Sequence, residues 1–67
     1  MRHRSNRYPI HYLEVGQHII FFPELGDNPK LVFQRVQQTA YRESARTGKL
    51  FTTETTELGG MLVTRIR

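Results

Sequence analysis

The chain has 67 residues, enough for one small domain, and a domain of this size buries only about 60% of its unfolded surface. It leaves no room for a deep, water-excluding active site, and the absence of cysteine excludes disulfides and thiolate metal sites. Ten Lys and Arg against six Asp and Glu give a net charge of +4, which favours an acidic partner, either phosphate or a protein surface. No apolar run approaches the roughly 20 residues of a membrane span, so a cytoplasmic protein without membrane contact is expected.

Residues 1–7, MRHRSNR, are basic and polar and show no periodicity. They predict a flexible basic arm, followed by a single domain over residues 8–67. The arm carries Arg2, Arg4 and Arg7. Its role stays open between a frayed chain end and a segment that becomes ordered on phosphate.

A first strand is expected over residues 17–22, where β-branched and aromatic residues follow a turn at residues 14–16 and end at Pro23. Residues 19–22 are four consecutive apolar residues. Such a run indicates a strand covered on both faces, or else one face that is an exposed contact surface. Coverage of both faces is the favoured interpretation.

One amphipathic helix is predicted over residues 29–47, with Asn28 as N-cap, Pro29 at the first helical position and Gly48 just beyond the end. At 100° per residue, one stripe collects the residues expected to pack inward: Phe33, Val36, Ala40 and Ser44, flanked by Val32 and Tyr41. Arg35, Arg42 and Arg46 fall on the opposite face, with Gln38 nearby. The helix therefore has one packing side and one cationic side.

Two further strands are expected over residues 49–56 and 61–67, joined by a hairpin turn at residues 57–60 that ends in paired glycines. Val63 and Ile66 have opposite parity, which suggests a bulge or burial on both faces near Thr64. The order strand, helix, strand, strand predicts an α+β fold in which one helix covers a face of a three-stranded, mainly antiparallel sheet. The core expected from it comprises Phe33, Val36, Ala40, Ile20, Phe22, Phe51 and Val63.

Nothing in the chain has the spacing of a catalytic or metal site. The histidines at positions 3, 11 and 18 lack the spacing of a zinc site, and no nucleophile, base and orienting group form a recognisable motif. A protein without enzymatic activity, metal or cofactor is expected. The candidate partner-binding residues are the cations inferred to be exposed: Arg35, Arg42, Arg46, Lys49, Arg2, Arg4 and Arg7. A plain solvated helix face is the alternative, since Glu43 lies three residues before Arg46 and can neutralise part of it.

Several short motifs resemble small phage-encoded proteins: VGQ at 15–17, IFFP at 20–23, AYR at 40–42, RTGKLFTT at 46–53, GG at 59–60 and VTRI at 63–66. Among such proteins are regulators that bind host bacterial RNA polymerase. The resemblance implies a non-enzymatic protein that docks on polymerase through a surface patch in the cytoplasm of the infected bacterium. It would inhibit initiation by displacing the sigma factor and would promote antitermination. A monomer is expected. The alternatives are a small basic protein that binds DNA or RNA directly through phosphate contacts and, less favoured, an accessory virion protein.

Overall fold

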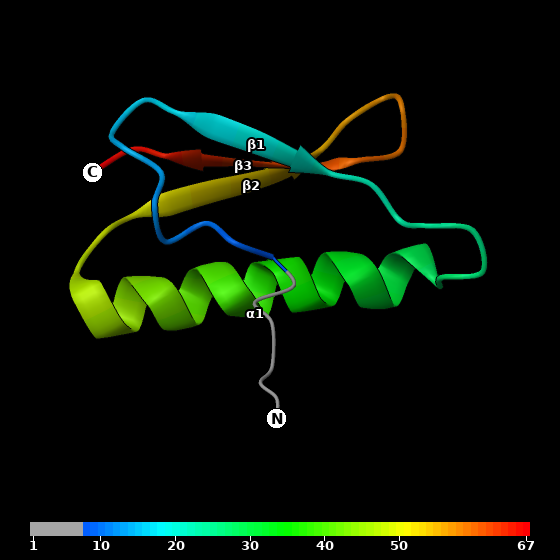
Figure 1. The fold of residues 1–67 in the computed structure, drawn as a ribbon, viewed down its shortest axis with the longest axis horizontal. Helices are drawn as coiled ribbons and strands as arrows, with labels where there is room; N and C mark the ends of the chain where they lie inside the picture. The colour runs from blue at the N-terminus through cyan, green and yellow to red at the C-terminus, as the bar shows by residue number, and fades with distance from the viewer. Residues whose placement is uncertain (1–7) are drawn as a thin grey trace.

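The computed structural model of the protein describes residues 8–67, and its elements follow the predicted order. They are β1 (His18–Phe21), α1 (Pro29–Thr47), β2 (Phe51–Thr55) and β3 (Met61–Arg65). The sheet has the order β1-β3-β2 with both pairings antiparallel, and α1 lies along one face of it (Figure 1). The α+β fold predicted from the sequence is confirmed.

Helix α1 begins and ends at the predicted residues. The Asn28 side chain accepts a hydrogen bond from the Lys30 N–H at 3.0 Å, and Pro29 occupies the first turn, where no N–H is required. Gly48 adopts φ 83° and donates its N–H to the Ser44 carbonyl at 2.8 Å. Glycine reaches this left-handed conformation without the steric penalty of a side chain, which fixes the helix end.

The N-cap gives a prediction of modest size. Replacing Asn28 by alanine leaves the Lys30 N–H without its side-chain acceptor, and we expect a loss of about 1 kcal/mol in the free energy of unfolding. Chemical denaturation followed by circular dichroism measures the loss. Asn28→Asp is the matched control, because it keeps an oxygen acceptor; an equal loss in both variants would contradict the capping role.

The strands are shorter than predicted at most of their ends. Before β1, the Gln17 N–H donates a hydrogen bond to the Glu14 carbonyl at 2.9 Å and so forms a turn. The Gln17 carbonyl still accepts a hydrogen bond from the Arg65 N–H at 3.0 Å. The suggested bulge is absent from the described ladder, because β3 pairs in unbroken register with both neighbours. Ile66 lies beyond β3 and is 50% exposed. Its parity therefore requires neither a bulge nor burial on both faces of the sheet.

The core lies between α1 and one face of the sheet. It consists of Ile10, Leu13, Val32, Val36, Ala40, Met61 and Val63, with Phe33 and Phe51 packed partly buried against it. The predicted inclusion of Ile20 and Phe22 is wrong: their side chains are 41% and 52% exposed. Because successive residues of a strand face opposite sides, Ile20 shares the outer face with its neighbour Leu62, and no described element covers that face.

The exposed side chains of Ile20 and Phe22 instead lie over Gly60. A Cβ atom at that position would come within 2.7 Å of an Ile20 methyl carbon and 2.8 Å of the Phe22 ring. The expectation that both faces of the first strand are covered is therefore wrong, and one face is exposed.

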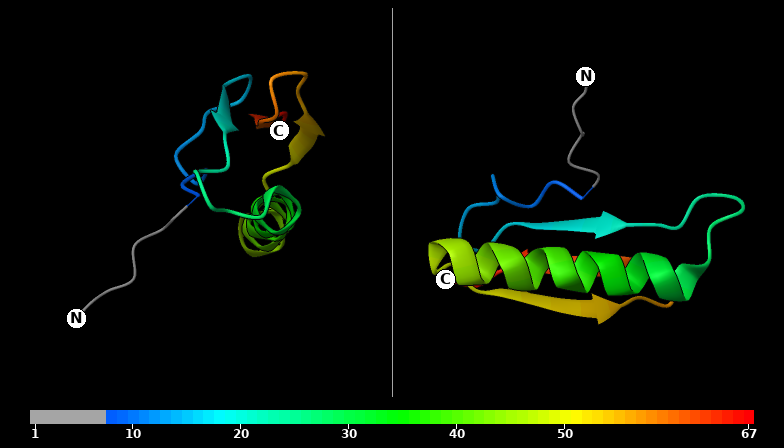
Figure 2. Two further views of the ribbon diagram at one scale, coloured as in Figure 1. Left: turned by 90° about the vertical axis from the view of Figure 1, so that its right-hand side faces the viewer. Right: turned by 90° about the horizontal axis from the view of Figure 1, so that it is seen from below.

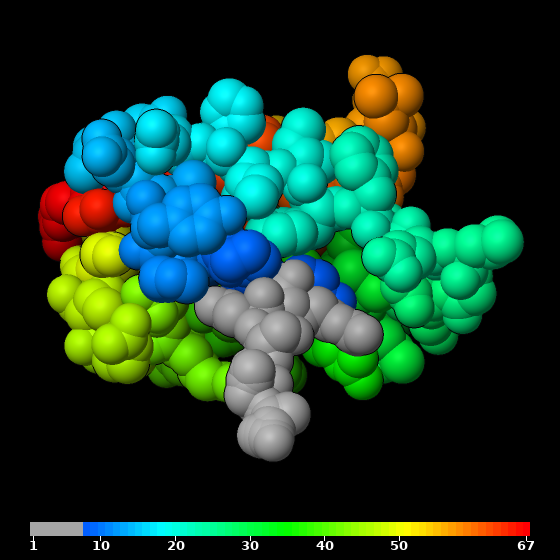
Figure 3. Space-filling model, viewed as in Figure 1, coloured from blue at the N-terminus to red at the C-terminus, as the bar shows by residue number. Residues whose placement is uncertain are grey.

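Residues 8–13 fill the space that Ile20 and Phe22 were expected to fill. Ile10 and Leu13 are 1% and 5% exposed, and Tyr8 packs edge-on against Phe21 with the ring centroids 5.4 Å apart. In Figure 3 this segment (blue) lies between β1 (cyan) and α1 (green). The segment thus closes the open side of the core.

Candidate binding surface on helix α1

The solvent-facing side of α1 carries an open depression of about 670 Å³. Its lining residues are Gln34, Gln37, Gln38, Tyr41 and Arg42, which together we call the helix surface. Tyr41 is 76% exposed, a large fraction for an aromatic ring, and no described element packs over it. The surface combines an aromatic ring, a guanidinium and three amides, so it can stack, donate and accept hydrogen bonds.

Two of the three predicted helix arginines carry a positive charge that no described carboxylate neutralises. Arg35 and Arg42 are exposed, and within residues 8–67 no carboxylate forms an ion pair with either. Arg46 donates from Nη2 to both carboxylate oxygens of Glu43 at 3.0 and 2.9 Å. Its side chain is 69% exposed while that of Glu43 is 12% exposed, so Arg46 remains accessible but its charge is largely balanced.

Lys49 has a structural contact that the sequence did not indicate. Its Nζ donates to the His11 carbonyl at 2.8 Å, and Arg65 Nη1 donates in the same way to the Leu13 carbonyl at 3.0 Å. Both cations therefore hold residues 8–16 against the sheet. The remaining candidates, Arg2, Arg4 and Arg7, lie outside the described residues.

The folded domain is nearly neutral overall. Of the ten Lys and Arg in the chain, three lie in residues 1–7, which leaves seven basic and six acidic residues in 8–67 and a net charge of +1. Helix α1 itself has four basic residues and one acidic residue, hence +3. Positive charge is thus concentrated on the helix and in the first seven residues, and the rest of the domain is acidic.

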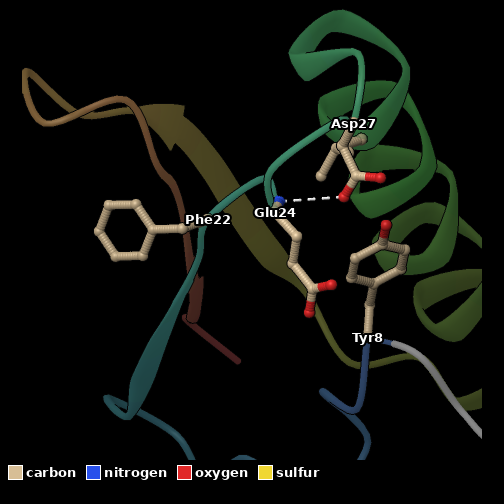
Figure 4. A pocket seen from close by; sticks show the side chains of 5 residues that line it. Tyr8, Phe22, Glu24 and Asp27 are labelled. Atoms are coloured by element: carbon tan, nitrogen blue, oxygen red, sulfur yellow. Dashed lines mark hydrogen bonds between the residues drawn. The ribbon is translucent and has the colours of Figure 1, made fainter.

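A second, smaller hollow of about 90 Å³ lies where the loop after β1 meets α1 (Figure 4). Its lining residues are Tyr8, Phe22, Glu24, Asp27 and Val32. The Glu24 N–H donates to Asp27 Oδ2 at 3.0 Å, and the Phe22 ring points away from Tyr8. The carboxylate of Asp27 therefore stabilises the loop turn, and the hollow contains no base paired with a nucleophile.

Sequence reasoning found part of the helix surface. The 100° spacing placed Arg35 and Arg42 on the solvent side with Gln38 nearby, but it missed Gln34 and Gln37. It also put Tyr41 at the flank of the packing stripe, whereas Tyr41 is 76% exposed. At 100° per residue Gln34 falls just beyond Tyr41, but Gln37 falls between Ser44 and Tyr41 on the predicted packing stripe, so the spacing gave no signal for Gln37.

Comparison of the chain with protein-family models, with curated proteins and with solved structures found no match. Within residues 8–67, no helix is long and apolar enough to cross a membrane. Within the same part of the chain, no three His, Asp or Glu residues are grouped so that they could hold a metal ion.

Proposed function

We propose that this chain is a non-enzymatic, phage-type transcription regulator that binds bacterial RNA polymerase through the helix surface and Arg35. The polymerase as partner rests on the motif resemblance at residues 15–66. Binding would displace the sigma factor, inhibit initiation and promote antitermination, and it would take place in the cytoplasm of the infected bacterium.

The observation that carries the proposal is the exposure of Tyr41 beside Arg42 in an open depression lined by glutamines. Tyrosine and arginine are over-represented among the residues that dominate protein–protein binding energy. The Tyr41 ring supplies a large rigid contact area, and the Arg42 guanidinium can form a bidentate pair with a carboxylate. An acidic protein surface is the partner with the complementary charge.

Direct binding of DNA or RNA is the second candidate, and Tyr41 also supports it because an exposed ring can stack on a base. The net charge of +1 over residues 8–67 weighs against it, because phosphate tracking depends on several unpaired cations along one path. Under this alternative, most of the affinity would come from Arg2, Arg4 and Arg7.

Charge reversal on the helix tests the proposal. We expect Arg35→Glu combined with Arg42→Glu to abolish capture of RNA polymerase in a pull-down, because a cation that meets an acidic surface becomes a repelling anion. Both side chains are exposed, so the thermal unfolding curve followed by circular dichroism should hardly change.

The matched control is Lys30→Glu combined with Arg67→Glu, which makes the same change in net charge at exposed residues outside the helix surface. We expect this control to retain polymerase. Retention by the test variant would move the contact away from α1, and equal loss in both variants would show that only overall charge matters.

An electrophoretic shift with duplex and single-stranded DNA, at several salt concentrations, separates the two candidates. Tight binding that weakens steeply with salt would favour direct contact with nucleic acid. Absence of a shift, together with polymerase capture, supports the protein target.

A further inference from the structure

Within residues 8–67, the outer edge of β2 carries backbone hydrogen-bonding groups that have no partner. The Ile66 N–H donates to the Leu50 carbonyl at 2.8 Å, and the Thr56 N–H donates to the Gly60 carbonyl at 2.9 Å. Hydrogen-bonded residues alternate along an antiparallel ladder, so the even-numbered residues of this strand bond to β3. The N–H and C=O groups of Phe51, Thr53 and Thr55 therefore face away from the sheet.

The two edges of the sheet differ in what lies beside them. Residues 8–13 run next to β1: Tyr8 packs on Phe21, and a hollow beside the strand is lined by Tyr12, Leu13 and residues 16–19. The outer edge of β2 has no described segment along it, as both views in Figure 2 show. Three of the five residues of β2 are threonines, which favour extended structure.

Charge is divided between the two ends of the molecule, and Figure 1 shows which elements lie at each end. The end with the 56–60 hairpin and the start of α1 carries Glu24, Asp27, Glu54 and Glu57 with Lys30, four acidic and one basic, hence −3. The end with the C-terminus and the last turns of α1 carries Arg42, Arg46, Lys49, Arg65 and Arg67 with Glu14 and Glu43, five basic and two acidic, hence +3. Strand β2 runs from the basic end to the acidic end.

We propose that a second copy of this chain is the partner of the β2 edge, joined by antiparallel pairing of the two β2 strands across a twofold axis. The outward-facing residues overlap most when Thr53 lies opposite Thr53 of the second copy and Phe51 lies opposite its Thr55. This register forms about six backbone hydrogen bonds, two at each of three residue pairs.

Charge complementarity selects a second copy as the partner. Antiparallel pairing places the acidic end of each copy beside the basic end of the other, which is attractive on both sides of the axis. In the same register Glu57 lies opposite Lys49 of the second copy, and Glu54 lies opposite its Thr52, so no like charges face each other. A twofold axis perpendicular to the sheet puts both α1 helices on one face of a six-stranded sheet. The dimer therefore presents two helix surfaces on the same side.

The central residue of the edge gives the first test. Thr53→Pro removes the outward N–H at the middle of the interface and leaves the bonds between β2 and β3 in place, since proline is tolerated where its missing N–H faces solvent. We expect the wild-type chain to dimerise with rising concentration in sedimentation equilibrium and Thr53→Pro to stay monomeric. Thr53→Ala is the matched control and should dimerise. Circular dichroism checks that each variant is folded.

A wild-type chain that stays monomeric at millimolar concentration would overturn the proposal, as would dimerisation of a folded Thr53→Pro. The register is tested by charge reversal. Glu57→Lys should weaken the dimer about tenfold at low salt, because it creates a like-charged pair with Lys49 of the other copy twice across the axis. Lys49→Glu should weaken it to the same extent; because it also removes the bond from Lys49 Nζ to the His11 carbonyl, circular dichroism must first show that this variant keeps the wild-type fold. The combined variant should recover the affinity. Failure to recover it would overturn the register with Thr53 at its centre.

Discussion

Replacing Ile10 by alanine is expected to remove a large part of the stability of this domain. Ile10 is 1% exposed and belongs to the core, although it lies in a segment without regular secondary structure. Truncation of a buried isoleucine to alanine costs about 2–5 kcal/mol, the lost transfer free energy plus the cavity that remains. Single domains are stable by about 5–15 kcal/mol, and small ones lie at the low end.

Urea denaturation measured by circular dichroism gives the change in free energy of unfolding. Tyr12→Ala is the matched control: it lies two residues away and its side chain is 57% exposed, so we expect a change of at most about 1 kcal/mol. If Ile10→Ala were no more destabilising than Tyr12→Ala, residues 8–13 would not be part of the core.

Val36→Asp is expected to abolish cooperative folding. Val36 lies near the middle of α1 and is 0% exposed, and the buried set around it contains no polar or charged side chain that could pair with a carboxylate. An unpaired carboxylate in such a site either costs several kcal/mol or takes up a proton, and in both cases it replaces well-packed valine. The total stability of a domain this small cannot offset that cost.

Ala45→Asp is the control for Val36→Asp, because Ala45 lies on the same helix and is exposed. We expect the free energy of unfolding of Ala45→Asp to lie within about 1 kcal/mol of the wild-type value. Val36→Asp should show neither a cooperative thermal transition nor dispersed amide resonances. A folded Val36→Asp would mean that this face of α1 does not point into the core.

The predicted helix was correct to the residue because its signals are local. Asn28, Pro29 and Gly48 act through the geometry of one turn at each end, and the 3.6-residue period assigns the solvent side without knowledge of the rest of the chain. The exposure of Arg35 and Arg42 followed from that period. The pairing of Arg46 with Glu43 was anticipated from their spacing for the same reason.

The sequence by itself thus determined the elements, their order and the cationic side of α1. Only the tertiary structure decided which face of β1 is buried and what closes the core, because period 2 separates Ile20 and Phe22 from Ile19 and Phe21 without saying which pair the helix covers. The tertiary structure also decided the burial of Ile10. The hydrogen bonds from Lys49 and Arg65 to the carbonyls of His11 and Leu13 join residues that are 38 and 52 positions apart in the chain. Contacts at that separation depend on the assembled sheet and helix, and local patterns do not encode them.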